Sequence, residues 1–360
     1  MRIIQLIVAP QYRGAEIFAS QLAVELKKNG HEVLYVSLFQ PKSKKYSPAG
    51  LTVIDLNAHP ALFVNLGLVF KLKKIIEDFR PDLIQANAGD TLKYAVLTRI
   101  LCNFSFRLVF RNASVAGKYI SDFKKKMLYR WFYNSADFII SVSEESRKDL
   151  ISLYPSCEEK IVVIPNGTLF KPICPVEEIE SAAFSLVHVG GFTYEKNHEG
   201  LIRIFASIKN KKPEVKLWLV GDGPLQGQIM DLANSKGLND FIFFKGAVLN
   251  PLDYIATADV LLLPSHIEGL PAVILEAFYC KTVVVAYDVG GINEVVKDGI
   301  TGWLVCVNDE NTFVDRVLHV IENHSLSQNI TQNAFELASE QYNIELIVSR
   351  FNQVYAKLIS

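Results

Sequence analysis

Residues 263–277 read LPSHIEGLPAVILEA, and this stretch decides the fold. The apolar run Val260–Leu263, which leads into this stretch, is suited to a strand that is buried on both faces. A Pro-Ser pair ends that strand, and a glycine and a proline mark a tight turn into a helix that begins at Ala272. The stretch therefore predicts a buried strand, a turn and a helix in close succession.

Two glutamates bracket the turn, with Glu268 in the loop and Glu276 about one helical turn inside the helix. A helix N-terminus offers unpaired N–H groups and partial positive charge, so a phosphate can bind there. A loop carboxylate can then bind sugar hydroxyls, and one inside the helix can bind a ribose. Taken singly, each glutamate is better explained as a solvated loop residue or as a charge favoured by the helix dipole. Together, in this order of elements, they favour a site for a nucleotide-diphosphate sugar.

The stretch Leu263–Ala277 resembles the signature of the retaining glycosyltransferases of family 4, in which two glutamates are separated by seven residues. That family has the GT-B fold, so the resemblance implies an α/β protein with two Rossmann-like, doubly wound parallel-sheet domains facing a central cleft. Glu268 is then expected to be catalytic as well as donor-binding. The donor-binding residues implied in this stretch are Glu268, Gly269, Leu270, Pro271, Ala272 and Glu276.

Composition agrees with a two-domain globular protein. The chain has 360 residues, half of them hydrophobic and 21% charged, and single cores rarely grow past about 250–300 residues. The formal net charge is −1, but residues 1–170 hold 23 Lys and Arg against 15 Asp and Glu, and the remainder holds 14 against 23. The two halves are therefore expected to have different partners, unless only their solvated faces differ.

Several protein classes are disfavoured by the sequence. No run approaches the ~18 apolar residues of a membrane span, and MRIIQLIVAP is expected to be a first strand instead of a signal peptide. The five scattered cysteines indicate free thiols in a cytoplasmic protein without a disulfide framework or zinc site. No basic stretch carries a nucleic-acid-binding motif.

Apolar runs alternate with helical patterns along the chain, which predicts βαβ units and parallel sheets. A Pro-containing stretch near residues 171–179 is expected to be the linker between domains. We expect residues 1–170 to form an acceptor-binding domain, on which a C-terminal helix at 344–360 packs back, and residues 171–343 to form the donor-binding domain. The predicted strands are Ile3–Val8, His31–Ser37, Leu51–Leu56, Asp82–Ala86, Arg107–Phe110, Phe138–Val142 and Ile161–Ile164, followed by Phe184–Val189, Lys216–Val220, Phe241–Phe244, Val260–Leu263, Thr282–Ala286 and Trp303–Val305.

A glycine loop follows the predicted strand Phe184–Val189 and ends in Glu-Lys-Asn at Asn197. The glycines let backbone approach a ligand, and Lys196 supplies a point charge for phosphate, although a lone lysine there is more often simply solvated. The resemblance implies that Lys196 is catalytic and contacts the donor diphosphate. Family members often carry an arginine directly after the first glycine, and Gly191, which the resemblance implies is donor-binding, stands at that position.

Other turns match the family less specifically. Gly221 and Asp222 follow a strand and are expected to line the nucleotide pocket, although a plain βα turn explains them equally well. The backbone near Val248 could contact the base. The double glycine at Gly290-Gly291 is interpreted as structural.

In the first domain, Gly14 precedes a helix and could admit a phosphate or the transferred sugar. Arg111, with Asn112 beside it, aligns with a family position that often holds a histidine near the acceptor, and Gln85 and Asn87 also stand where histidines are common. No histidine is an obvious catalytic base. In a front-face retaining transfer the leaving phosphate oxygen takes the acceptor's proton, so neither a protein base nor a metal ion is required, and no cofactor is expected.

The sequence thus predicts a retaining glycosyltransferase that moves a sugar from a nucleotide-diphosphate donor to a glycan or lipid-linked glycan in cell-surface polysaccharide or lipopolysaccharide synthesis. Two stretches, Leu62–Lys74 and Tyr119–Arg130, mix lysines with aromatic residues and could contact the inner membrane peripherally, although helices with a buried apolar side explain each one singly. An inactive accessory subunit of the same fold is the alternative, and a nucleotide-sugar epimerase is a weaker one.

Overall fold

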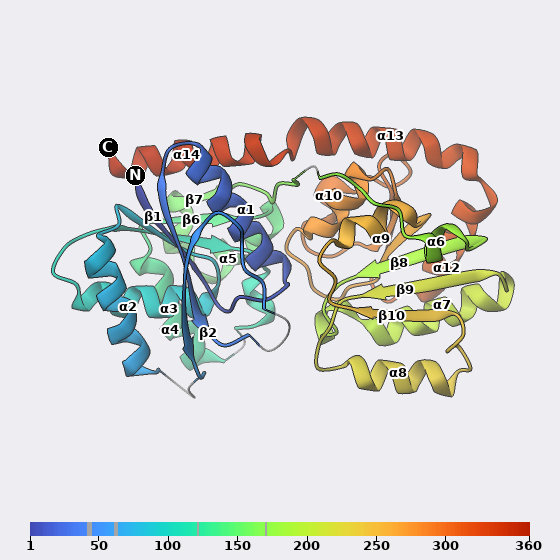
Figure 1. Cartoon of the computed structure of the whole chain (residues 1–360), viewed down its shortest axis with the longest axis horizontal. Coiled ribbons are helices and arrows are strands. Elements are labelled where there is room, and N and C mark those ends of the chain that lie inside the picture. Colours follow the sequence, from blue (N-terminus) through green and yellow to red (C-terminus); the bar gives the residue numbers. More distant parts are fainter. Residues whose placement is uncertain (42–44, 61–63, 121, 170) are drawn as a thin grey trace. The chain divides into compact units, whose positions relative to one another are not determined.

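The chain divides into two compact units. We describe it from a computed structural model that covers residues 1–41, 45–60, 64–120, 122–169 and 171–360, with side chains throughout except at 324–326. Unit 1 comprises Met1–Gly167 and Ile344–Ser360, and unit 2 comprises Thr168–Asn343. Figure 1 shows the elements of each unit.

Unit 1 is built on a seven-stranded parallel sheet in the order β3-β2-β1-β4-β5-β6-β7. The order reverses between β1 and β4, as in a doubly wound sheet. Each strand lies where the sequence predicts one, with shifts of a few residues at the ends. The strands are β1 (Arg2–Ile7), β2 (Glu32–Phe39), β3 (Thr52–Ala58), β4 (Leu83–Ala86), β5 (Arg107–Asn112), β6 (Phe138–Ser141) and β7 (Ile161–Val163).

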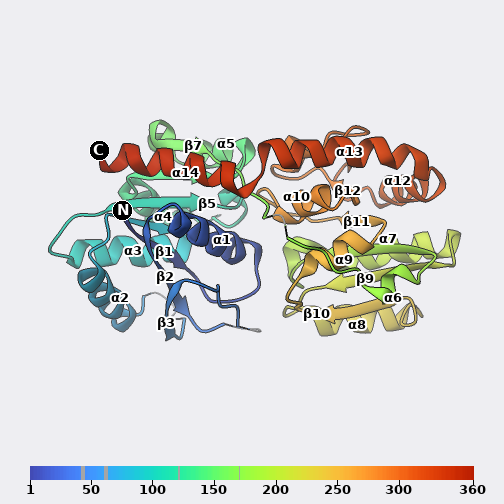
Figure 2. The ribbon, with the colours of Figure 1, turned by 45° about the horizontal axis from the view of Figure 1, so that its top comes forward.

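Helices cover both faces of this sheet. The C-terminal helix α14 packs on α1, with the rings of Phe18 and Phe351 6.0 Å apart, while α3 contacts both α2 and α4 (Figures 1 and 2). Two helices, α3 and α5, lie where the sequence analysis predicts no element. The helices are α1 (Gly14–Lys28), α2 (Leu66–Phe79), α3 (Gly89–Leu101), α4 (Phe123–Ser135), α5 (Glu144–Leu153) and α14 (Ile344–Ile359), with 3₁₀ turns at Ala116–Lys118 and Pro155–Lys160.

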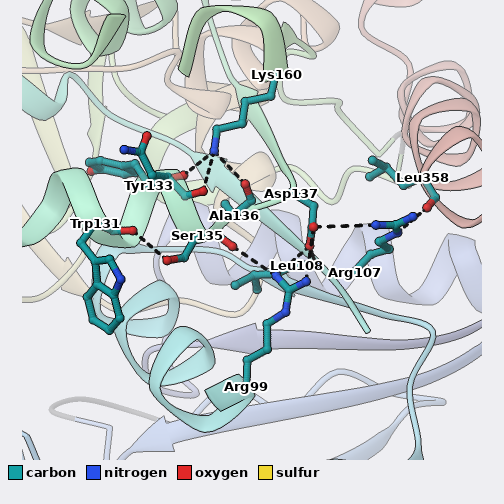
Figure 3. A network of polar contacts seen from close by, with 11 residues as sticks. Arg99, Arg107, Leu108, Trp131, Tyr133, Ser135, Ala136, Asp137, Lys160 and Leu358 are labelled. Carbon is teal, nitrogen blue, oxygen red and sulfur yellow. Dashed lines mark hydrogen bonds and ion pairs between the residues drawn. The ribbon is translucent and has the colours of Figure 1, made fainter. Parts of the chain in front are cut away.

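A polar network fixes the C-terminal end of α4 (Figure 3). The Lys160 ammonium donates to the carbonyls of Tyr133, Asn134 and Ala136, at 2.9, 3.0 and 2.8 Å. These carbonyls lie at the negative end of the helix dipole, and that of Tyr133 also accepts the N–H of Ala136 at 3.2 Å. The Arg99 guanidinium of α3 adds a bond to the carbonyl of Ser135.

The same network reaches α14. Asp137 accepts the backbone N–H of Leu108 at 2.7 Å and lies 2.8 Å from the Arg99 guanidinium. Arg107, 3.9 Å from Asp137, donates to the carbonyl of Leu358 at 2.6 Å, so the last turn of α14 is tied to the start of β5 (Figure 3).

Unit 2 has a six-stranded parallel sheet in the order β10-β9-β8-β11-β12-β13, which reverses between β8 and β11. Three of its strands have the predicted bounds. The strands are β8 (Phe184–Val189), β9 (Val215–Val220), β10 (Ile242–Gly246), β11 (Val260–Leu263), β12 (Val283–Tyr287) and β13 (Trp303–Val305).

The longer helices of unit 2 pack on the sheet and on one another. Helix α13 lies along α10, and α12 lies against α7 (Figure 2). The linker predicted near residues 171–179 runs without regular structure as far as α6. The helices are α6 (Glu177–Glu180), α7 (His198–Lys211), α8 (Gln226–Ser235), α9 (Pro251–Thr257), α10 (Ala272–Tyr279), α11 (Ile292–Val295), α12 (Glu310–Glu322) and α13 (His324–Gln341), with a 3₁₀ turn at Tyr194–Lys196.

The chain passes between the units twice, and the two passages are neighbours. Thr168 N–H donates to the carbonyl of Tyr342 at 2.7 Å, and Thr168 forms a parallel bridge with Asn343. On the unit 1 side, a Cβ on Gly167 would lie 3.0 Å from the Cα of Ile344. Two parallel doubly wound sheets are the fold class that the sequence predicts, and that prediction is confirmed.

Candidate active site

The predicted donor residues of unit 2 gather at the carboxyl edge of its sheet. Strands β9 and β10 are added on one side of β8, and β11, β12 and β13 are added on the other side. Loops that leave two such strands diverge and open a crevice at the carboxyl ends, which is where doubly wound sheets bind ligands. Lys196 follows β8 and Glu268 follows β11, so both lie beside this switch point.

Lys196 and Glu268 form an ion pair, although 72 residues separate them. Nζ of Lys196 donates to Oε1 of Glu268 at 2.6 Å, with the side chains 21% and 9% exposed. Glu268 is therefore not a solvated loop residue. The bond uses one of the three donors of the ammonium group. A positive and a negative group thus lie together beside the switch point of unit 2.

Glycines allow the loop after β8 to pack on the turn after β9. Gly190 N–H donates to the carbonyl of Val220, and Phe192 N–H to that of Asp222, both at 2.9 Å. A Cβ on Gly221 would lie 2.1 Å from the carbonyl oxygen of Gly190, so position 221 requires glycine. The backbone contact explains Gly221 without a ligand.

Gly191 has room that the neighbouring glycines lack. A Cβ there would lie 3.4 Å from the carbonyl oxygen of Asp222, an ordinary contact, and its φ lies outside the left-handed region. Asp222 is partly buried and its carbonyl is used by Phe192. Val248, partly buried, follows β10, whose last residue Gly246 accepts the N–H of Gly221 at 2.9 Å.

Asn197, to which the sequence analysis gives no role, joins the loop after β8 to the end of β11. It adopts the left-handed conformation, with φ 51°, and caps α7 by accepting the N–H of Gly200 at 3.1 Å. Its Nδ2 donates to the carbonyl of Pro264 at 3.0 Å, and His266 N–H donates to the carbonyl of Glu195 at 2.7 Å. An asparagine directly before a helical pattern is the signal that predicts such a cap.

The loop after β12 supports the loop that carries Glu268. Gly291 N–H donates to the carbonyl of Gly269 at 2.6 Å. Gly290 has φ 55°, and a Cβ there would lie 2.0 Å from the carbonyl oxygen of Glu268. The double glycine is therefore structural, since it lets two loop backbones touch.

Helix α10 begins without a side-chain cap. Pro271 is its N-cap, Leu270 and Pro271 are buried, and Ala272 is partly buried. The first N–H groups of a helix have no intrahelical acceptor, so those of α10 can bind an anion.

Glu276 lies one turn inside α10. Burial raises the pKa of this carboxyl to about 7, against an opposing effect of Lys171. In the part of the chain that the structure describes, no donor is placed to bind this side chain. Glu276 is partly buried, and such a carboxyl without a protein donor gains from hydroxyl donors on a ligand.

The predicted residues of unit 1 are placed differently. Gly14 is exposed at the first position of α1, whose N-cap Arg13 gives no side-chain bond. Arg111 and Asn112, at the end of β5, are 1% and 4% exposed. Nδ2 of Asn112 donates to the hydroxyl of Ser141 and to the carbonyl of Ser146, which ties β5 to β6 and α5.

Arg111 is a buried cation. It donates to Oδ1 of Asn166, and its guanidinium carbon lies 4.3 Å from the ring centre of Phe18. Its Nε and Nη1 have no hydrogen-bond partner among the described residues. Burial lowers the pKa of Arg111 to about 10, which Glu16 opposes, and burial raises the pKa of Glu16 to about 7.

The switch point of unit 1 is filled by a closed set of amides. Asn87 donates to Gln5 at 3.0 Å, Gln85 donates to Asn87 at 2.9 Å, and the hydroxyl of Tyr355 on α14 donates to Gln85. Gln5 donates to the same hydroxyl at 3.4 Å. All four side chains are buried.

Within the ranges given above, no three His, Cys, Asp or Glu side chains are grouped so that they could hold a metal ion. No helix in those ranges combines the length and the apolar character that crossing a membrane requires.

Comparison with known proteins extends these observations. A family model described as Glycosyl transferases group 1 matches residues 175–337, and one described as Glycosyltransferase Family 4 matches residues 12–168. N-acetyl-alpha-D-glucosaminyl L-malate synthase of Bacillus anthracis is 25% identical over 96% of this chain and 94% of its own length.

Two further proteins bear on the donor and the acceptor. N-acetylgalactosamine-N,N'-diacetylbacillosaminyl-diphospho-undecaprenol 4-alpha-N-acetylgalactosaminyltransferase of Campylobacter jejuni is 28% identical over 56% of this chain and 55% of its own length. The structure of Anabaena HepE in complex with UDP-glucose superposes with a TM-score of 0.85 at 20% identity, over 99% of this chain and all of that chain. This likeness shows a GT-B fold.

Proposed function

The chain belongs to the family 4 glycosyltransferases, and on that basis we propose that it moves a sugar from a nucleotide-diphosphate sugar to a hydroxyl of a glycan or lipid-linked glycan, with retention. The observation that carries the proposal is the Lys196–Glu268 pair at the switch point of unit 2, beside the uncapped start of α10. HepE, which shares the fold, binds UDP-glucose, and this supports a nucleotide-sugar donor.

In the proposed reaction, the bond from the anomeric carbon to the diphosphate oxygen breaks. The bond to the acceptor oxygen forms on the same face, and the acceptor's proton passes to the leaving diphosphate. Lys196 and the first N–H groups of α10 stabilise the charge that develops on the leaving group. Glu268 accepts hydroxyl groups of the sugar, and Glu276 accepts those of the ribose. Gly14 and Arg111 are proposed to act on the sugar and acceptor side.

We propose that no metal ion is needed, because Lys196 and the helix N-terminus supply positive charge at the diphosphate. The Campylobacter relative acts, by its name, on a diphospho-undecaprenol-linked sugar, which supports a lipid-linked acceptor and a role in cell-surface polysaccharide or lipopolysaccharide synthesis. We also propose that the enzyme is cytoplasmic.

Peripheral contact with the inner membrane is part of the proposal and rests on α4. Phe123, Met127 and Trp131 recur every four residues along this helix and are 72%, 61% and 43% exposed. Exposed lysines and an arginine lie between them, at Lys124–Lys126 and Arg130. An apolar row flanked by cations suits an anionic bilayer. Leu62, Phe63 and Ser121, which belong to the two stretches singled out in the sequence, lie outside the described residues.

Vesicle sedimentation tests this contact. We expect binding to vesicles that contain phosphatidylglycerol, weaker binding to pure phosphatidylcholine, and loss of binding in F123A/M127A/W131A. Equal binding by wild type and triple variant would refute a role for α4.

A donor screen tests the proposed reaction. UDP-, GDP- and ADP-sugars are compared by thermal shift and then by hydrolysis or transfer, with EDTA present. A donor at a hundred times its Kd should stabilise the protein by about 2.7 kcal/mol. The shift should be much smaller in E276A and K196A than in wild type. If no nucleotide sugar binds to folded protein, the accessory-subunit alternative is favoured, whereas activity that EDTA abolishes refutes metal independence.

A further inference from the structure

A buried histidine pair lies beneath the loop that carries Lys196. His188 is the fifth residue of β8 and is fully buried, and His198, the first residue of α7, is 2% exposed. Their rings meet edge to face with centres 4.7 Å apart, and the ring of Phe192 stacks on His198 at 4.1 Å. Neither histidine belongs to the donor-binding set proposed above.

His188 replaces a bond of the sheet at the switch point. Strands β8 and β11 pair at Leu186 with Val260 and at Val187 with Leu261, and among the described residues the pairing ends there. The next residues in register are His188 and Leu262. There the ring Nδ1 of His188 lies 2.8 Å from the carbonyl oxygen of Leu262. A side chain thus satisfies a carbonyl at the point where the two strands separate.

This bond determines the tautomer of His188. A carbonyl oxygen can only accept, so Nδ1 must carry the proton. Burial, with a further effect of Lys196, lowers the pKa of His188 to about 4, so the ring is neutral near pH 7 and its Nε2 has no proton. That Nε2 has no partner among the described residues.

Nε2 of His188 and the stem of Lys196 both lie close to Gly190. A Cβ on Gly190 would lie 3.0 Å from Nε2 of His188 and 3.3 Å from Cδ of Lys196. The ring and the lysine stem therefore occupy the space that a side chain at position 190 would need. Nδ1 of His188 thus bonds to β11, and its Nε2 lies near Gly190, in the loop that carries Lys196.

We propose that His188, as a neutral Nδ1–H imidazole, is a positioning residue that sets the separation of β8 and β11 and thereby holds Lys196 against Glu268. The inference rests on the proposed function, because its binding test assumes that a nucleotide binds beside Lys196. The adjacent ring of His198, on which Phe192 stacks, is also neutral near pH 7, since burial and the neighbouring His188 lower the pKa of His198 to about 2.

Two substitutions separate this role from simple packing. In H188N the amide nitrogen can take the place of Nδ1, whereas in H188Q it lies near the place of Nε2. H319Q is the matched control, because His319 on α12 also packs edge to face on an aromatic ring, that of Trp303, at 5.3 Å. The probe is whichever of UDP, GDP or ADP gives the largest thermal shift with wild-type protein.

We expect H188N and H319Q to bind this nucleotide within about twofold of wild type. H188Q should bind it about tenfold more weakly, since it loses one bond and displaces the lysine. In a K196M background the effect of H188Q should shrink to less than about twofold, because residues that act through one another are not additive. Equal losses in H188N and H188Q, or an undiminished loss without Lys196, would overturn the proposal.

An NMR spectrum of the histidine side chains tests the tautomer of His188 without any ligand. Long-range proton–nitrogen correlation of the imidazoles should show His188 as the neutral Nδ1–H tautomer at pH 7, and an Nε2–H or charged ring overturns the inference. If wild-type protein binds no nucleotide, the proposed donor fails, while the spectrum still tests His188.

Discussion

The two sheets share one topology but use their switch points differently. In unit 1 the edge between β1 and β4 is closed by Gln5, Gln85, Asn87 and the hydroxyl of Tyr355, all buried. In unit 2 the edge between β8 and β11 carries glycine turns and the partly exposed Lys196–Glu268 pair.

The polar groups at the switch point are buried and bonded to one another in unit 1, whereas in unit 2 the lysine is partly exposed. Amides that satisfy one another in a dry core stabilise the fold and leave little capacity for a ligand. A partly exposed lysine that makes one hydrogen bond keeps donors for an incoming anion. We therefore expect changes at this edge of unit 2 to affect nucleotide binding and transfer, and changes in the buried set of Gln5, Gln85, Asn87 and Tyr355 in unit 1 to affect stability.

The largest effect should come from K196M. Loss of the ammonium removes charge stabilisation of the leaving diphosphate, so kcat/KM for the donor should fall by about 10² to 10³. The control is K212M, because Lys212 also pairs with a glutamate of unit 2, Glu322 at 3.1 Å. Steady-state kinetics measure the change, and equal losses in the two variants would abolish the distinction.

Y355F should lower the stability of the protein and leave nucleotide binding unchanged. It leaves the buried Gln5 and Gln85 without the hydroxyl, which should cost about 1–3 kcal/mol of unit 1 stability. Differential scanning calorimetry should show a lower midpoint, while nucleotide affinity stays unchanged. Y254F is the control, since no described residue bonds to the hydroxyl of Tyr254. A stable Y355F with weak nucleotide binding would contradict the comparison.

Glu276 should make nucleotide binding depend on pH. Its pKa is about 7 in the free protein, and only the ionised carboxylate accepts two ribose hydroxyls. Binding should therefore release a proton below pH 7, and Kd should rise by up to about tenfold for each pH unit below 7 and level off above it. Calorimetry in buffers of different ionisation enthalpy measures the proton release. The pH dependence should flatten in E276Q, and a profile that stays unchanged would remove Glu276 from the site.

The smallest effect, a gain, is expected from G191R. The position tolerates a Cβ, and a guanidinium there could bind the diphosphate beside Lys196. Nucleotide affinity should rise about threefold to tenfold. G227R, on α8 where a Cβ has no neighbour within 4 Å, makes the same change away from the site. A loss of affinity in G191R alone would show that glycine is needed at this position.

Much of the fold could be predicted because its signals are local. The strand β11 and the start of α10 follow from an apolar run, a turn and a helical period, and their bounds match the prediction. Helix α5 was missed although Ser143 caps it. The Lys196–Glu268 contact could not be read from spacing, because only the sheet order brings these residues together. The burial of Arg111 likewise depends on α1, which the local sequence does not reveal.

The neighbouring passages at Thr168 and Asn343 make unit 2 a cassette inserted at a single point of unit 1. Because Gly167 lies against Ile344, a short peptide could close unit 1 after excision of residues 168–343. Chimaeras could then exchange residues 168–343 between relatives and test whether, as the proposed function implies, donor choice moves with this unit.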